Sequence, residues 1–255
     1  MPENPKTVWI TGASSGLGEA LAHEFANDDH QVCLSARSAD KLAAVNSSLS
    51  KSGKVYACDV TDDYALTTTV EKIFTDVGAI DIAVLNAGVY VPTPLADLNA
   101  DDARGLFEVN FFSIIRTIEL LVPRMTERDA GHIVVVSSVA GDVGLPYASV
   151  YSASKSALHR LCESLYPELQ SKGVLISVVS PGFVRTPATD KNDFPMPFII
   201  SAERAAQEIR EGIAARRFEI RFPFMMGFIM RRLAHLPKPL LLWFTKRMLR
   251  NDDAT

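Results

Sequence analysis

Short apolar runs alternate with longer segments of mixed polarity along most of the chain. The apolar runs are nearly continuous, which is typical of parallel strands covered on both faces. They are Thr7–Thr11, Gln31–Ala36, Lys54–Cys58, Asp81–Leu85, His132–Ser137 and Val174–Val179. The segments between them have helical length and are Leu17–Asn27, Ala39–Leu49, Asp62–Val77, Asp101–Glu127 and Val150–Ser171. This alternation predicts an α/β protein with a single doubly wound parallel sheet flanked by helices.

The chain shows no clear internal division. Its 255 residues are compatible with one large domain or two small ones, but no repeat, low-complexity tract or linker separates two parts. We therefore expect one domain over residues 1–215. The C-terminal extension, residues 216–255, is apolar and basic, and we do not expect it to be an independent domain.

The composition is that of an ordinary globular protein. Hydrophobic residues make up 47% and charged residues 22% of the chain, which excludes a disordered chain, a collagen-like repeat and a disulfide scaffold. Three scattered cysteines, Cys33, Cys58 and Cys162, favour a reducing compartment and argue against a zinc site. The first residues lack the basic region and apolar stretch of a signal peptide, so we expect a cytoplasmic protein that holds no metal.

A glycine cluster follows the first predicted strand. Gly12, Gly16 and Gly18 stand between that strand and the first predicted helix. Residues without a Cβ allow a tight turn and a close approach of pyrophosphate to the backbone, and the helix N-terminus offers free N–H groups to phosphate. Three glycines can also close a plain turn, but the strand–turn–helix context favours a nucleotide site.

The end of the second predicted strand indicates which nucleotide binds. An NAD site usually has Asp or Glu there to bind the ribose hydroxyls, whereas this chain has Arg37. A guanidinium suits a 2′-phosphate, and Ser14 or Ser38 could add a hydroxyl donor. The alternative is an arginine that is simply solvated. Because Asp or Glu is also missing at this position, Arg37 favours NADP(H) over NAD(H).

Two further motifs carry candidate chemistry. Tyr151 and Lys155 have the i, i+4 spacing that places both side chains on one face of a helix, where an ammonium can stabilise a phenolate. Ser137 and Ser138 end the apolar run before this helix, at the edge where α/β sheets bind ligands. A serine there could hydrogen-bond a carbonyl oxygen that Tyr151 protonates. Either motif alone is weak evidence.

Together these motifs resemble the short-chain dehydrogenase/reductase family, whose Rossmann fold has a parallel sheet of the predicted kind. The resemblance covers roughly residues 6–190. It rests on Thr11–Gly18, Asn86-Ala87-Gly88, Asn110, Ser138, Tyr151-x-x-x-Lys155 and Pro181-Gly182-x-Val184-x-Thr186, in this order and at the family's spacing.

The resemblance implies four catalytic residues. Tyr151 is the implied general acid and base, and Lys155 the residue that lowers the Tyr151 pKa and binds the nicotinamide ribose. Ser138, rather than Ser137, is implied to hold and polarise the substrate oxygen. Asn110 is implied to position a water that links Lys155 to solvent.

The resemblance also implies the cofactor contacts, with Asp59 and Val60 beside the adenine ring and Asn86-Ala87-Gly88 along the adenosine ribose. The complete set of predicted cofactor-binding residues is Gly12, Ser14, Ser15, Gly16, Leu17, Gly18, Arg37, Asp59, Val60, Asn86, Ala87, Gly88, Tyr151, Lys155, Pro181, Gly182, Val184 and Thr186. Leu85 stands where the family often has a further asparagine, which is a small departure.

The family pattern fades after Thr186, where substrate choice is expected to reside. Residues 194–199 are a candidate apolar lid, and Ser201 is a candidate helix N-cap. Residues 216–255 carry a net charge of +6 and the rest of the chain −10. The longest uncharged stretch of this tail, Phe222–Met230, is too short to span a bilayer. Residues 222–250 could instead lie on a membrane surface, pack between subunits or cover the substrate cleft.

The leading hypothesis is an NADP(H)-dependent oxidoreductase that transfers a hydride between nicotinamide and a lipophilic carbonyl or secondary alcohol. The alternatives on the same fold are a catalytically silent nucleotide sensor and a membrane-surface lipid-binding protein. Residues 101–127 and 150–171 resemble the family's usual subunit contacts, which implies a homodimer or homotetramer. Nucleic acid is not an expected partner, since the main domain is acidic and has no basic stripe with interleaved aromatics.

Overall fold

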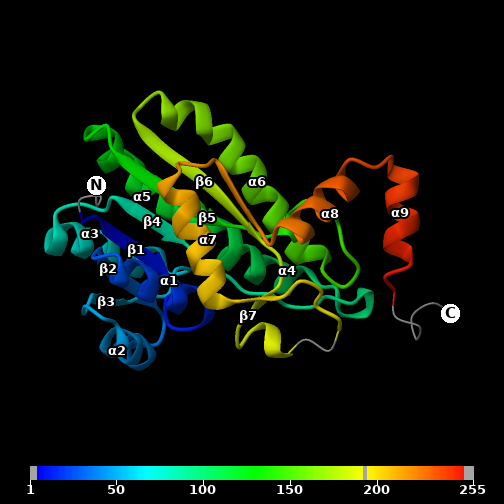
Figure 1. Ribbon diagram of the computed structural model, residues 1–255, viewed down its shortest axis with the longest axis horizontal. Coiled ribbons are helices and arrows are strands. Elements are labelled where there is room, and N and C mark those ends of the chain that lie inside the picture. The colour runs from blue at the N-terminus through cyan, green and yellow to red at the C-terminus, as the bar shows by residue number, and fades with distance from the viewer. Residues whose placement is uncertain (1–4, 192–193, 250–255) are drawn as a thin grey trace.

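Seven parallel strands form the central sheet of the protein (Figure 1). The computed structural model describes residues 5–191 and 194–249. The sheet order is β3-β2-β1-β4-β5-β6-β9. Its strands are β1 (Thr7–Thr11), β2 (Gln31–Ala36), β3 (Lys54–Ala57), β4 (Ile82–Leu85), β5 (Gly131–Val136), β6 (Val174–Pro181) and β9 (Glu219–Phe222). The predicted doubly wound parallel sheet is therefore confirmed, with five strand boundaries shifted. β3 ends before Cys58, β4 begins after Asp81, β5 begins at Gly131 and ends before Ser137, and β6 continues to Pro181.

The edge strand β9 was not predicted. Its four residues alternate, with Ile220 and Phe222 buried and Glu219 and Arg221 half-buried. This period-two pattern is typical of a strand covered unequally on its two faces, so it lacks the continuous apolar run used to find the others. β9 pairs in parallel with β6. The sheet therefore extends to residue 222, past the expected domain boundary at 215.

The helices alternate with the strands as predicted, and two more follow in the C-terminal extension. They are α1 (Gly16–Asn27), α2 (Ala39–Ser48), α3 (Asp63–Val77), α4 (Ala100–Phe107), α5 (Ser113–Glu127), α6 (Ser149–Gln170), α7 (Ala202–Ala214), α8 (Phe224–Ala234) and α9 (Lys238–Lys246). Short 3₁₀ turns lie at Leu95–Asp97, Val139–Gly141 and Thr189–Lys191, and β7 (Val184–Arg185) pairs with β8 (Ile200–Ser201).

Two predicted helix features have clear outcomes. Ser201 caps α7, because its hydroxyl accepts the backbone N–H of Arg204 at 3.2 Å. The single helix expected over Asp101–Glu127 is instead divided into α4 and α5 by a π-helical turn, Glu108–Phe112. Such a turn inserts one residue into the helical ladder, and it frequently marks a functional position.

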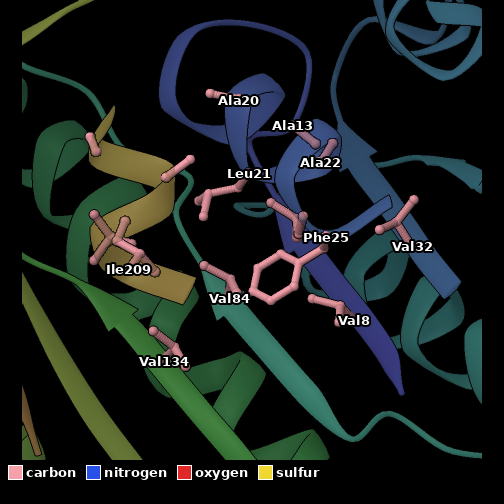
Figure 2. Close-up of a cluster of buried hydrophobic side chains, with 14 of the residues drawn as sticks. Val8, Ala13, Ala20, Leu21, Ala22, Phe25, Val32, Val84, Val134 and Ile209 are labelled. Carbon is pink, nitrogen blue, oxygen red and sulfur yellow. The ribbon is translucent and has the colours of Figure 1, made fainter. Parts of the chain in front are cut away.

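Side chains of each central strand pack into two separate cores, one on each face of the sheet. In β1, Val8 and Ile10 point into a core that contains Phe25 of α1 and Ile209 of α7, as Figure 2 shows for Val8, Phe25 and Ile209. Trp9, between them, belongs to the opposite core, under α3, α5 and α6. Coverage on both faces explains the continuous apolar runs of the sequence.

The three cysteines are buried and unpaired. Burial raises the pKa of the Cys33 and Cys162 thiols to about 12, so both stay protonated at neutral pH. Within residues 5–191 and 194–249, we find no group of three His, Cys, Asp or Glu side chains placed to bind a metal ion. No helix of the described part is long and apolar enough to cross a membrane.

His132 is a titratable group inside the sheet. It is 6% exposed on β5, and its Nε2 lies 2.7 Å from the Ser177 hydroxyl. That hydroxyl donates to the carbonyl oxygen of Arg217 at 2.6 Å, so Nε2 carries the proton that Ser177 accepts. Burial lowers the pKa of His132 to about 4, with smaller contributions from Lys6 and Arg216.

This lowered pKa predicts an acid-sensitive fold. Between about pH 6.5 and about pH 4 the unfolded chain binds a proton at His132 that the folded chain excludes, so stability falls as the pH falls. The shift corresponds to about 3 kcal/mol over that window. In urea unfolding, His132→Gln should therefore lose less stability than the wild type between about pH 7 and about pH 5.

The matched control is the exposed His235→Gln, which should keep the wild-type dependence on pH. If the wild type and both variants lost the same stability as the pH fell, His132 would not be the cause of the acid sensitivity.

Candidate active site

A cavity of about 450 Å³ lies at the carboxyl ends of β1 to β4. Thirteen of the eighteen predicted cofactor-binding residues line it, although they come from five separate segments. These are Gly12, Ser14, Ser15, Gly16, Leu17, Gly18, Arg37, Asp59, Val60, Asn86, Ala87, Gly88 and Thr186. Parallel strands end at one edge of the sheet, so the turns that follow them meet there.

The glycine turn shapes one wall of this cavity. Gly12 (φ +67°) and Gly16 (φ +58°) have left-handed backbone conformations that favour glycine. A Cβ on Gly12 would lie 2.9 Å from the Ala87 Cα, and one on Gly18 would overlap the Gly12 carbonyl oxygen. α1 begins at Gly16, so the N–H groups of its first turn lie at the cavity wall, where an anion would be stabilised.

The loop after β4 is tied to the glycine turn. The Asn86 side-chain amide donates to the carbonyl oxygens of Thr11 at 3.0 Å and Gly12 at 3.3 Å. The Thr11 hydroxyl accepts the backbone N–H groups of Asn86 and Ala87, both at 3.0 Å. These bonds hold two walls of the cavity at a fixed separation.

The outer end of the cavity combines two cations with one carboxylate. Arg37 and Lys41 are exposed and line it together with Asp59. Asp59 accepts the backbone N–H of Thr61 at 3.0 Å and its hydroxyl at 2.8 Å. The backbone bond lowers the pKa of Asp59 most, and the Thr61 hydroxyl and Arg37 lower it further, so the carboxylate is charged at neutral pH.

Lys41 was missed by the sequence analysis. It lies in the first turn of α2, just past the end of β2 and Arg37, and no spacing in the sequence singles it out. Ser38, considered as a phosphate donor, caps α2 by accepting the Lys41 backbone N–H at 3.3 Å. The other lining residues not predicted are Ala36, Cys58, Val89, Val109, Pro187 and Ala188, which are mainly apolar.

The candidate catalytic residues meet beside this cavity. Tyr151, in the first turn of α6, interacts through its hydroxyl with that of Ser138, which follows β5. The Tyr90 ring packs edge-on against Tyr151 with the ring centroids 4.9 Å apart. Burial raises the pKa of Tyr151, and the Ser138 hydrogen bond offsets part of that rise. The phenol is therefore protonated at neutral pH.

Lys155 lies one helical turn further along α6. It is 4% exposed, and its Nζ donates to the carbonyl oxygen of Val136 at 2.9 Å. Burial lowers the Lys155 pKa to about 8. Its Nζ is 5.8 Å from the centroid of the Tyr151 ring. The expected lowering of the Tyr151 pKa by Lys155 is not found, because burial dominates at both residues.

The two adjacent serines make different contacts. The Ser137 hydroxyl donates to the carbonyl oxygen of Lys155 at 2.9 Å, which ties β5 to α6. Ser137 is buried, whereas Ser138 is half-buried and contacts Tyr151. Only Ser138 therefore presents its hydroxyl beside the candidate acid.

Asn110 lies in the π-helical turn and is fully buried. Its amide oxygen accepts the Val89 N–H at 2.8 Å, and its amide nitrogen donates to the Val89 carbonyl at 2.9 Å. A Cβ on Gly88 would lie 3.2 Å from the Asn110 Oδ1 and 3.5 Å from the Lys155 Nζ. Gly88 and Val89 line the cavity, so Asn110 and Lys155 lie directly behind its wall.

Five predicted cofactor residues do not line the cavity. Tyr151 and Lys155 lie beside it, and Val184 is buried in β7. Pro181 ends β6, and the following Gly182 donates its N–H to the Phe222 carbonyl at 2.7 Å. A Cβ on Gly182 would lie 2.9 Å from the Met226 Cγ, so this segment packs against α8.

Comparisons with known proteins identify the family of this chain. The family model for short chain dehydrogenases matches residues 6–195. An uncharacterized oxidoreductase of Myxococcus xanthus is 34% identical over 238 residues, which cover 92% of this chain and 94% of that protein.

Two solved structures show the same fold. A short chain dehydrogenase/reductase of Burkholderia phymatum, in complex with NAD, matches with a TM-score of 0.80 at 26% identity, over 100% of this chain and 95% of that one. A short-chain dehydrogenase of Sphingobium yanoikuyae, in complex with NADPH, matches with a TM-score of 0.78 at 24% identity, over 91% of this chain and 96% of that one. With the family match over most of its length, this chain belongs to the short-chain dehydrogenase/reductase family and is an oxidoreductase of that type.

Proposed function

We propose that this protein is an NADP(H)-dependent oxidoreductase that transfers a hydride between nicotinamide and the carbon of a lipophilic ketone, aldehyde or secondary alcohol. The observation that carries the proposal is the interaction of the Tyr151 and Ser138 hydroxyls, beside Lys155 and next to a cavity that thirteen predicted cofactor residues line. Catalysis of this kind needs a proton donor and an oxygen-binding hydroxyl at one position.

The residues present fit a dinucleotide. A Cβ on Gly12 would meet Ala87 and one on Gly18 would meet the Gly12 carbonyl oxygen, so only glycines allow this tight turn, which leads to the N-terminus of α1 at the cavity wall. We assign the pyrophosphate to this wall and the adenosine to Asp59 and the Asn86-Ala87-Gly88 loop. When bound, the cofactor supplies or accepts the hydride.

Tyr151 is the proposed proton donor in the direction of reduction. Its raised pKa keeps the phenol protonated at neutral pH, and the Ser138 hydroxyl next to it can hold the substrate oxygen in place. In the reverse direction Tyr151 takes the proton of the alcohol. Lys155 carries a charge at neutral pH and lies behind Gly88, from where it can donate to ribose hydroxyls.

The proposed preference for NADP(H) rests on the two cations at the outer end of the cavity. Arg37 and Lys41 both line it, and Arg37 follows β2 at the position where an acidic residue would bind the ribose hydroxyls of NAD. A 2′-phosphate would make charge-assisted hydrogen bonds with both side chains. The Asp59 carboxylate is nearby but is occupied by Thr61.

The proposed lipophilic substrate rests on the apolar surroundings of Ser138. Val139 and Val143, which follow it, form a separate core with Met226, Met230 and Leu241 of the C-terminal helices. On the lid segment, Phe194 packs against Phe183 with the ring centroids 6.0 Å apart. Phe183 also packs against this core, so the segment that follows Ser138 lies among apolar side chains.

The proposed homodimer or homotetramer is supported by exposed apolar residues on the expected contact helices. Phe112, in the π-helical turn, is 49% exposed and Ile115 of α5 is 37% exposed. Both lie within residues 101–127, the first of the two segments that resemble family subunit contacts.

Removal of the Tyr151 hydroxyl tests the proposed mechanism. With NADPH and a panel of aliphatic, aromatic, steroid and quinone carbonyls, Tyr151→Phe should lower kcat by about 100- to 10,000-fold, because the proton donor is lost. Tyr166→Phe removes one hydroxyl further along α6 and should leave kcat unchanged. Turnover by Tyr151→Phe near the wild-type rate would rule out this role.

The charge of Lys155 predicts a pH dependence of cofactor binding. Below about pH 8 the ammonium donates charge-assisted hydrogen bonds, and above it the amine becomes neutral, so the Kd for NADPH should rise as the pH rises through about 8. Fluorescence titration of NADPH would measure it. Lys155→Met should bind more weakly and lose this inflection. If Lys155→Met showed the same inflection in the Kd for NADPH, the inflection would belong to another titratable group.

Charge reversal at the outer end of the cavity tests the cofactor preference. Arg37→Asp should lower kcat/KM for NADPH by about tenfold or more, because the 2′-phosphate loses its charged partner. The kcat/KM for NADH should change much less. Lys41→Glu should act in the same direction. Arg204→Asp, an exposed change on α7, is the control. If the ratio of kcat/KM for NADPH to kcat/KM for NADH were unchanged in Arg37→Asp, the proposed preference for NADP(H) would be rejected.

A further inference from the structure

The two C-terminal helices leave many large apolar side chains exposed. On α8, Phe224 is 78% exposed, and on α9, Leu242 is 64% exposed. The exposed apolar residues of this segment are Phe224, Met225, Phe228, Ile229, Leu240, Leu242, Trp243, Phe244, Met248 and Leu249. We call residues 224–249, with these side chains, the C-terminal apolar surface. A monomeric protein rarely leaves so many large apolar groups together in water.

On α8 these side chains follow a helical stripe. Phe224 and Phe228 are one turn apart and stack with their ring centroids 6.2 Å apart. Arg232, one turn further, places its guanidinium 4.9 Å from the centroid of the Phe228 ring. The stripe therefore runs from apolar to cationic along one face.

The same arrangement recurs on α9. Leu240, Trp243, Phe244 and Arg247 have the spacing of one helix face. The Arg247 guanidinium lies 3.3 Å from the centroid of the Trp243 ring. Each helix thus combines exposed aromatic rings with a cation that covers one of them.

The charge of this segment is one-sided. Residues 224–249 contain five Lys and Arg and no Asp or Glu, whereas residues 1–215 carry a net charge of −10. Arg231 pairs with Glu219 of β9, and Lys238 and Lys246 are exposed. The C-terminal apolar surface is therefore complementary to an anionic partner, and the acidic body would be repelled by that partner.

The opposite sides of both helices are anchored in the domain. Met226 and Met230 of α8 and Leu241 of α9 are buried together with Val139 and Val143. In Figure 1, α9 stands at the outer end of the molecule, far from the central strands. The exposed side chains are thus the outward faces of helices held by their inward faces.

We propose that the C-terminal apolar surface docks on an anionic lipid bilayer, with α8 and α9 lying in the headgroup region. Amphipathic segments with aromatic and basic residues bind there, Trp favours the interface, and long cationic side chains reach the headgroups from an apolar position. A symmetric contact with a second copy would bring together two surfaces that both carry positive charge. The proposal does not depend on the proposed reaction. Of the predicted segment 222–250, Arg250 lies outside the described residues.

Vesicle flotation of the full chain tests the proposal. The probes are vesicles of phosphatidylcholine alone and with about 30% phosphatidylserine, at low and high salt. The wild type should bind the anionic vesicles, bind the neutral ones more weakly, and be released at high salt. Lys238→Glu with Lys246→Glu should weaken binding by about tenfold or more, because each basic residue contributes to surface attraction.

Matched controls separate this surface from general charge and hydrophobicity. Lys51→Glu with Lys172→Glu changes the net charge equally on the body of the protein and should bind like the wild type. Phe224→Ser with Trp243→Ser should weaken binding, whereas Tyr64→Ser, at a residue 82% exposed on α3, should not. Thermal unfolding of each variant checks its folding, and the lysine variant does not alter any buried side chain.

Three outcomes would overturn the proposal. These are absence of wild-type binding, equal binding to neutral and anionic vesicles, and wild-type binding by the Lys238→Glu/Lys246→Glu variant. Light scattering decides whether a second copy covers the surface instead. An oligomer that the tail variants dissociate, with no vesicle binding, would assign the C-terminal apolar surface to a subunit contact.

Discussion

The packing of α6 against the end of β5 determines the geometry of the candidate active site. Two hydrogen bonds of 2.9 Å join them, from Ser137 to the Lys155 carbonyl and from the Lys155 Nζ to the Val136 carbonyl. A Cβ on Gly141 would lie 3.0 Å from the Lys155 carbonyl oxygen. The turn after Ser138 can therefore approach α6 this closely only because residue 141 is glycine. Tyr151, one turn before Lys155, is thereby held against Ser138, and the same burial sets the pKa of both ionisable groups.

The C-terminal helices are coupled to this site through a half-buried ion pair. Arg221 of β9 makes two contacts with the Asp142 carboxylate, one of them at 3.0 Å, and Asp142 ends the 3₁₀ turn that begins after Ser138. Glu219 joins Arg221 to Arg231 of α8. Gly227 leaves space for this arrangement, because a Cβ there would lie 2.5 Å from the Arg221 Cδ. The turn after Ser138 and the C-terminal apolar surface are thus supported by the same ion pairs, although they are far apart in the sequence.

Much of this protein could be predicted from local signals. Continuous apolar runs located six of the seven strands of the central sheet, and the positive φ values at Gly12 and Gly16 agree with the predicted tight turn. Thirteen of the predicted cofactor residues line one cavity, because turns after parallel strands must meet at one edge. β9 escaped prediction because it alternates charged and apolar residues and so lacks the continuous apolar run that located the other strands. The π-helical turn at Asn110 escaped because hydrophobic periodicity does not distinguish it from an uninterrupted α-helix.

The sequence by itself determined the class of fold, the position of the nucleotide turn and the residue types of the candidate site, since these depend on short-range spacing and backbone freedom. Only the tertiary structure decided the electrostatics. Lys155 was expected to lower the Tyr151 pKa, yet the structure buries both groups, and desolvation raises one pKa and lowers the other. It also placed Lys41 beside Arg37 in the cavity and separated the buried from the exposed faces of α8 and α9. Burial and electrostatic environment depend on residues distant in the chain, and no local pattern reports them.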